Sequence, residues 1–145
     1  MARDSYHHGN LRQALVEATV RLIEEKGPQG FTLAEAARAV GVSAAAPYRH
    51  FAGRDQLLEE IARQGFEEFA DRLSAALKLG QTPLSAFLGM GQAYLGFAVA
   101  KPGFYMAMFE SGISIAGNAD LALAAQQAEA ASLRFEEALR RGIRA

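Results

Sequence analysis

The chain has 145 residues, a net charge of −1 at neutral pH and no cysteine, and half of its residues are hydrophobic. This length and composition suit one packed domain or one and a half, and they exclude disulfides, thiolate metal sites and cysteine nucleophiles. No apolar segment follows a basic one at the N-terminus, so we expect a cytoplasmic protein without a signal peptide. The long uncharged stretch 82–100 has helical spacing and includes Ser85 and Gln92, which favours a buried helix over a membrane span.

The spacing of apolar residues is helical throughout, and no segment alternates long enough to form a strand, so the predicted fold class is all-α. Asn10 with Gln13 and Thr32 with Glu35 have the spacing of helix-capping pairs. Glycine or proline follows most of the expected helices and ends them. The predicted helices cover 10–26, 32–40, 43–51, 54–79, 83–101, 103–111 and 119–141.

The most informative segment is TLAEAARAVGVSAAAPYRHF, residues 32–51. Its two short helices are joined at Gly41, which permits a tight turn, and the small Ala37 lies where the helices would cross. This is the spacing of a helix-turn-helix motif, whose second helix enters the DNA major groove. An ordinary helical hairpin is the alternative. Pro47 falls early in the second helix, so we expect that helix to begin with a distorted or tightened turn.

Residues 6–75 resemble the N-terminal domain of the tetracycline-repressor (TetR) family in the order and spacing of several short motifs. These motifs are HHGNLR from His7, Phe31-Thr32, GVSAAAPYRHF from Gly41, and RDQLL from Arg54. A weaker similarity to the regulatory domain of one TetR subgroup covers 93–111. The resemblance implies a three-helix DNA-binding domain in 1–53, joined through a long fourth helix to a helical ligand-binding and dimerisation region in 54–145. Family members continue for further helices, so that second region is expected to be incomplete.

The resemblance further implies a homodimeric repressor that binds a palindromic DNA operator and is released by a small-molecule effector. Tyr48 and His50 match the family's phosphate-contacting pair, and Arg54 stands where a lysine is usual. Chemically, Arg49 can contact phosphate or guanine, and alanines can meet thymine methyl groups. The helix N-termini favour an anion. The predicted DNA-binding residues are Thr32, Ser43, Ala44, Ala45, Tyr48, Arg49, His50 and Arg54.

Six aromatic residues lie between 87 and 109, with several methionines beside them. Such side chains suit an apolar pocket between helices, although plain core packing accounts for the same pattern. With the family resemblance, we expect an apolar or aromatic effector to contact some of them. The predicted ligand-binding residues are Phe87, Met90, Tyr94, Phe97, Tyr105 and Phe109.

No catalytic combination, cofactor motif or metal site is predicted, and adjacent His7 and His8 are better explained as part of an arm near DNA. The rival hypothesis is a helical ligand-binding or interaction module that has lost operator binding; an enzyme is a distant third. Self-association would use the last helix, which carries more apolar residues than an outer helix needs, namely Leu121, Leu123, Leu133, Phe135 and Leu139.

Overall fold

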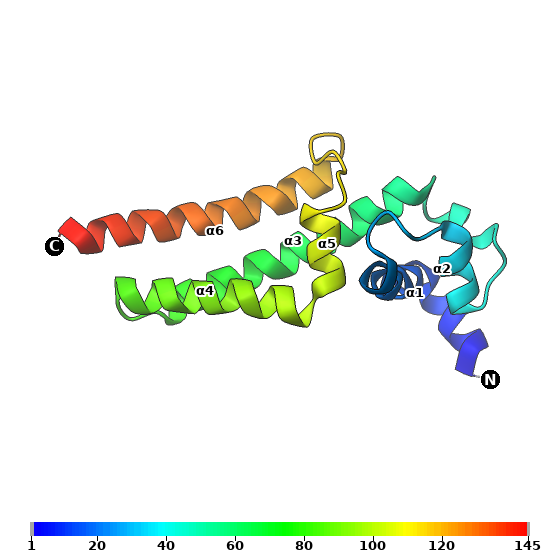
Figure 1. Ribbon diagram of the computed structural model, residues 1–145, viewed down its shortest axis with the longest axis horizontal. Coiled ribbons are helices and arrows are strands. Elements are labelled where there is room, and N and C mark those ends of the chain that lie inside the picture. The colour runs from blue at the N-terminus through cyan, green and yellow to red at the C-terminus, as the bar shows by residue number, and fades with distance from the viewer. Residues whose placement is uncertain (1, 145) are drawn as a thin grey trace.

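The computed structural model describes residues 2–144, apart from the side chains of 2–9, 135, 138, 139 and 142–144. The described chain is helical and contains no strand, which confirms the all-α prediction. Its elements are α1 (Ala2–Lys26), α2 (Leu33–Val40), the 3₁₀ turn η1 (Ala46–Arg49), α3 (Arg54–Leu79), α4 (Pro83–Ala100), α5 (Pro102–Phe109) and α6 (Ala119–Arg144). Figure 1 shows α4 and α6 running beside α3 toward one end, with α1 and α2 gathered at the other.

The predicted helix start at Asn10 is only partly right. Helical backbone begins at Ala2, and Asn10 interrupts it with φ −157° and ψ 34°. Asn10 therefore marks a break between two helical stretches rather than the first turn of the chain. His7 and His8 precede this break, and their side chains lie outside the described residues.

The predicted caps of the second helix are confirmed. The hydroxyl of Thr32 accepts a hydrogen bond from the backbone N–H of Glu35 at 3.1 Å. Gly41 ends the helix in the left-handed region at φ +79°, and its N–H donates to the carbonyls of Ala37 and Arg38. A residue with a Cβ is disfavoured at that φ, so glycine allows the sharp reversal after α2.

The predicted α-helix over 43–51 is wrong, because only the four residues of η1 are helical there and they form a 3₁₀ turn. Pro47 is buried at the second position; it has no N–H and pushes the preceding Ala46 away from α-helical angles. Ser43 does not cap the turn with its side chain; its carbonyl accepts from the N–H of Ala46 at 3.1 Å. The expectation of a tightened turn at Pro47 is confirmed.

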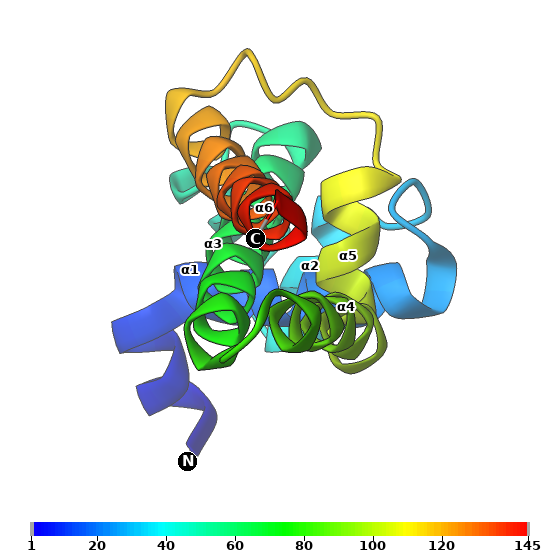
Figure 2. The same cartoon turned by 90° about the vertical axis from the view of Figure 1, so that its left-hand side faces the viewer.

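Helix α3 is shared between two hydrophobic clusters. Leu57, Leu58 and Ile61 pack with α1 and α2, whereas from Ala62 onward its buried residues pack with α4, α5 and α6. Helix α5 links the two clusters, because Ala107 belongs to the first cluster and Met108 belongs to the second. The end-on view in Figure 2 shows α3, α4 and α6 bundled, with α5 beside them. The division at residue 53 stays a prediction, and burial places the first turns of α3 in the N-terminal core.

The prediction of a buried helix over 82–100 is also wrong. Only Ala86, Met90 and Phe97 of α4 are buried, and Val99 is 82% exposed. By length and composition, helix α4 is long and apolar enough to cross a membrane, and 17% of its residues are buried. A single such helix is no indication of a membrane protein, because helices of soluble proteins can have the same length and apolar composition. Its apolar residues surround the whole helix, whereas the described chain covers only one side.

A polar cluster joins α1 to α3 near the boundary between the two cores. Glu60, whose side chain is 9% exposed, accepts hydrogen bonds from Arg63 at 2.6 and 2.9 Å and from Gln64 at 3.0 Å. It also pairs with Arg12 of α1 at 3.1 Å. Burial alone would raise the pKa of Glu60, but the hydrogen bonds from Arg63, Arg12 and Gln64 outweigh it and lower the pKa to about 2. The carboxylate therefore stays ionised and holds the two helices together.

We expect Glu60→Gln to lower the free energy of unfolding by about 1–3 kcal/mol at pH 7, because it leaves part-buried guanidinium groups without their carboxylate. The pKa of Glu60 is lower in the folded chain than its ordinary value of 4.5. Its stabilising effect is therefore complete above pH 4.5 and is lost as the pH falls toward 2. Urea denaturation of both proteins from pH 7 to pH 3 checks this, and the difference between them should shrink on acidification. Glu67→Gln, at an exposed carboxylate that also pairs with Arg63, is the control, with a change below about 1 kcal/mol. A difference that is constant with pH contradicts the assignment.

Candidate nucleic-acid interface and ligand cavity

The segment after α2 presents a short row of exposed side chains. Tyr48 is 60% exposed, and no described residue forms a hydrogen bond or ion pair with the side chain of Tyr48 or Arg49. The structure brings these two residues together with the other predicted contacts of this segment. Six predicted contacts in this segment are exposed, namely Ser43, Ala44, Ala45, Tyr48, Arg49 and His50; Thr32, at the N-terminus of α2, is exposed as well.

Buried residues on either side hold this row in place. Ala46 and Pro47 turn inward within η1, so the side chains next to them in the sequence face outward. Phe51 is 2% exposed and its ring lies 5.0 Å from the Arg12 guanidinium of α1. The N–H groups of His50 and Phe51 both donate to the carbonyl of Pro47 at 3.0 Å. Residues 43–50 thus form a turn that buried residues fix to the N-terminal core. This turn is called the reading turn below.

His50 also borders a small polar cavity of about 140 Å³ between the reading turn, α3 and the start of α6. Arg12, Glu59 and Asp120 line it, and Asn118 donates a hydrogen bond to Glu59 at 2.9 Å. This bond joins the loop before α6 to the first turns of α3. Sequence reasoning missed this contact, since its two residues are 59 positions apart.

Arg54 is engaged within the protein. Its Nε donates to the carbonyl of Phe31 at 3.1 Å, Nη2 donates to the carbonyl of Pro28, and the guanidinium lies 4.5 Å from the centre of the Phe31 ring. Arg54 therefore locks the loop between α1 and α2 against the first turn of α3. This role was not evident from the sequence, and the contact of Arg54 with the DNA backbone stays a prediction.

A second, larger cavity of about 560 Å³ lies between α3, α4 and α6. Four of the six predicted ligand residues line it: Phe87, Met90, Tyr94 and Phe109. Sequence reasoning missed the walls contributed by α3 and α6, although their helical spacing would have placed them on one face. The missed residues are Phe66, Phe69, Leu73, Ala125, Ala128, Glu129, Ser132 and Glu136.

The two remaining predicted ligand residues lie outside the lining. Phe97 is fully buried, with its ring 5.3 Å from that of Phe69, so it belongs to the core. Tyr105 stands beside the cavity: its hydroxyl is 3.1 Å from that of Tyr94, and its ring is 4.9 Å from Phe109. The hydrogen bond with Tyr105 raises the pKa of Tyr94. Tyr105 therefore orients two residues of the wall.

The predicted pairing surface on α6 needs one correction. Leu121 is fully buried among the side chains of the second core and offers nothing to a partner. Leu123 and Leu133 are 56% and 53% exposed, so they remain available. The side chains of Phe135 and Leu139 lie outside the described residues.

The chain has a turn between α2 and η1 with exposed polar side chains, and a separate helical body with a cavity. These two features define a helix-turn-helix protein of two helical parts. Residues 15–61 match the family model described as bacterial regulatory proteins of the tetR family. The fold of the whole chain is similar to solved structures. A protein with unknown function from Rhodococcus sp. RHA1 has a TM-score of 0.75 and 29% sequence identity over 90% of this chain and 68% of that one.

One more solved structure and one curated protein are also similar to this chain. The TetR family transcriptional regulator PfmR from Thermus thermophilus has a TM-score of 0.65 and 24% identity, over 90% of this chain and 68% of that one, and shows the fold alone. The HTH-type transcriptional regulator BetI of Rhizobium meliloti is 38% identical over 72 residues, which are 50% of this chain and 36% of that protein. The chain thus spans about a third of the length of this curated relative. Together these similarities support a TetR-family transcriptional regulator, with the family model matching residues 15–61.

We expect Arg54→Lys to destabilise the free protein nearly as much as Arg54→Gln, by about 1–2 kcal/mol. A lysine keeps the charge but cannot reach both carbonyls and also stack on Phe31. Urea denaturation without DNA measures this, with the same two substitutions at the exposed Arg38 of α2 as the control. If Arg54→Lys leaves the stability unchanged, the internal contacts are not important and a role limited to phosphate contact is favoured.

Proposed function

We propose that the chain is a sequence-specific, DNA-binding transcriptional regulator, a repressor that is released when a small apolar or aromatic molecule occupies its larger cavity. One observation carries this proposal: Tyr48, Arg49 and His50 are exposed on a turn fixed by buried residues, within the segment that matches the family. A rigid turn loses little conformational freedom on binding, which favours recognition.

The chemistry of the turn suits a DNA backbone and base edges. The Tyr48 hydroxyl and the His50 imidazole can donate hydrogen bonds to phosphate oxygens, which position a protein on the duplex. The Arg49 guanidinium can contact a phosphate or donate two hydrogen bonds to a guanine. The exposed alanines at 44 and 45 allow close approach and contact with thymine methyl groups.

Regulation would pass through α3. Phe66, Phe69 and Leu73 of this helix line the cavity, while its first turn is held to the α1–α2 loop by Arg54. A molecule that displaces the cavity wall therefore acts on the helix that supports the reading turn. To release DNA, the effector must bind the released state better than the DNA-bound state by a few kcal/mol.

A second candidate function is a helical ligand-binding module that no longer binds an operator. The net charge of −1 and the two alanines in the reading turn favour it, because both weaken a general attraction to DNA. Both candidates share the cavity, so DNA binding is the property that separates them.

We expect the double variant Tyr48→Ala/His50→Ala to lose DNA affinity by about tenfold or more, since each removed hydrogen bond to phosphate contributes about 1 kcal/mol. If Arg49 contacts a phosphate, Arg49→Ala should reduce the slope of log affinity against log salt concentration by about one. If Arg49 contacts a base, the variant should lose the preference for one base pair. Gel shift against the DNA upstream of the protein's own coding sequence measures both, with Gln127→Ala on α6 as a control far from the turn. Undiminished affinity in the double variant would count against the proposal and favour the second candidate.

We expect DNA binding to need two copies of the chain, since one reading turn covers only a few base pairs. Two turns about 34 Å apart would reach successive major grooves of a palindrome. Self-association through the exposed part of α6 is expected to be weak because a single helix face buries little area. Sedimentation at micromolar concentration, with a palindromic site and with its half-site, tests this. A strict monomer that binds the half-site as tightly as the palindrome contradicts it.

A further inference from the structure

The larger cavity is lined by aromatic rings from three helices. Phe66 and Phe69 come from α3, Tyr94 from α4 and Phe109 from α5. Their rings pack edge to face, with centroids 5.5 Å apart for Phe66 and Phe109 and 5.3 Å apart for Phe69 and Tyr94. The face of an aromatic ring carries partial negative charge and attracts a cation.

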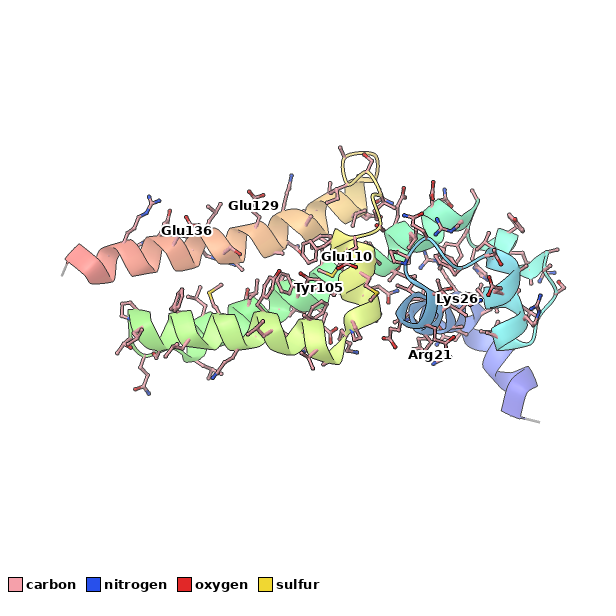
Figure 3. The ribbon with its side chains drawn as sticks, viewed as in Figure 1. Arg21, Lys26, Tyr105, Glu110, Glu129 and Glu136 are labelled. Carbon is pink, nitrogen blue, oxygen red and sulfur yellow. The ribbon has the colours of Figure 1, made fainter. Side chains whose placement is uncertain are left out.

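The fourth helix of the lining, α6, carries two carboxylates. Glu129 and Glu136 line the cavity, and no described lysine, arginine or histidine does. Glu136 pairs at 4.0 Å with Arg140 on its own helix, and both side chains are more than half exposed, so this pair neutralises little. No described side chain forms an ion pair with Glu129. Figure 3 shows Glu129 and Glu136 along α6, with Tyr105 below that helix.

We propose that the ligand of this cavity is a hydrophobic cation, a quaternary or protonated amine or a similar ion that carries aromatic or alkyl groups. The inference rests on the proposed function in treating the cavity as the effector site, and it names the class of effector. Both features of the lining favour the same charge, because ring faces and carboxylates each attract a cation and repel an anion. The volume of about 560 Å³ suits a ligand of drug-like size.

A neutral aromatic molecule is the main competing ligand. It would gain the same apolar burial on the rings, but it would gain nothing from Glu129 or Glu136. A neutral ligand therefore predicts that both carboxylates can be replaced without effect, whereas a cation predicts that their replacement weakens binding. The sign of the ligand charge separates the two cases.

Tetraphenylphosphonium and tetraphenylborate test the charge directly, because they have nearly the same size and apolar surface and opposite charge. Calorimetric titration of the full chain should show the phosphonium binding at least about tenfold more tightly than the borate. Equal affinities, tighter binding of the borate, or no binding of either ion would overturn the proposal. A cavity occupied by a second copy of the chain would bind neither ion, and it would overturn the proposal in the same way.

The double variant Glu129→Gln/Glu136→Gln should weaken phosphonium binding about tenfold and leave borate binding equal or stronger. Glu137→Gln is the matched control, because Glu137 lies on the same helix outside the lining and pairs with Arg141 at 3.5 Å. Tyr94→Leu should weaken phosphonium binding while Tyr94→Phe retains it, since only the phenylalanine keeps a ring. Unchanged phosphonium affinity in the glutamate double variant would overturn the proposal even if Tyr94→Leu weakens binding.

The DNA assay keeps this inference separate from the proposed function. If the phosphonium binds with the expected preference but does not release DNA, the cation site is supported and the proposed regulation fails. If a neutral aromatic compound releases DNA and the phosphonium does not bind, the regulation stands and the cation site is overturned.

Discussion

The continuity of α3 is the constraint on which the rest of the structure depends. Its 26 residues contribute Leu57, Leu58 and Ile61 to the N-terminal core, and the residues from Ala62 onward to the second core. The helix runs without a break from one core to the other. The reading turn leads into the first turn of α3, and Phe66, Phe69 and Leu73 of the same helix line the cavity.

The contacts across the boundary between the cores are tight and polar, which limits how the two parts can shift. Glu60 and Arg12 tie α3 to α1, and paired amides of Gln13 and Gln64 lie beside them at 2.9 and 3.1 Å. The Glu60 side chain is 9% exposed, so removing its partners would leave a nearly buried carboxylate unpaired, which is costly.

Local chemistry explains what the sequence could predict. The cap at Thr32 and the reversal at Gly41 depend on residues within four positions of each other, so a short motif is sufficient. The tightened turn at Pro47 follows from the missing N–H of proline. These local features of the N-terminal part were therefore predictable, whereas the replacement of the expected helix over 43–51 by the four-residue η1 was not.

Long-range packing explains what could not be predicted. The direction of the Arg54 side chain depends on carbonyls 23 and 26 residues earlier, which only the folded loop brings within reach. The cavity needs Glu129 and Ser132 of α6 to face Tyr94 of α4, and no local spacing reveals that partner. Helix α4 is apolar on every side, so its pattern could not indicate which side would be covered.

Helix α5 gives the cavity a second route to the N-terminal core. Gly103 lies so close to α1 that an added Cβ would be 2.6 Å from the Val20 carbonyl oxygen. A Cβ added at Gly65 of α3 would be 2.6 Å from the Met108 sulfur of α5. Glycine at both positions lets α5 pack directly on α1 and on α3. Phe109, at the end of α5, lines the cavity, so a ligand that moves this ring pushes on a helix that has no free space toward α1. Close-packed interfaces respond to such a push by shifting as whole helices rather than by local compression. Under the proposed regulation, a ligand in the cavity would therefore act on the N-terminal core through both α3 and α5.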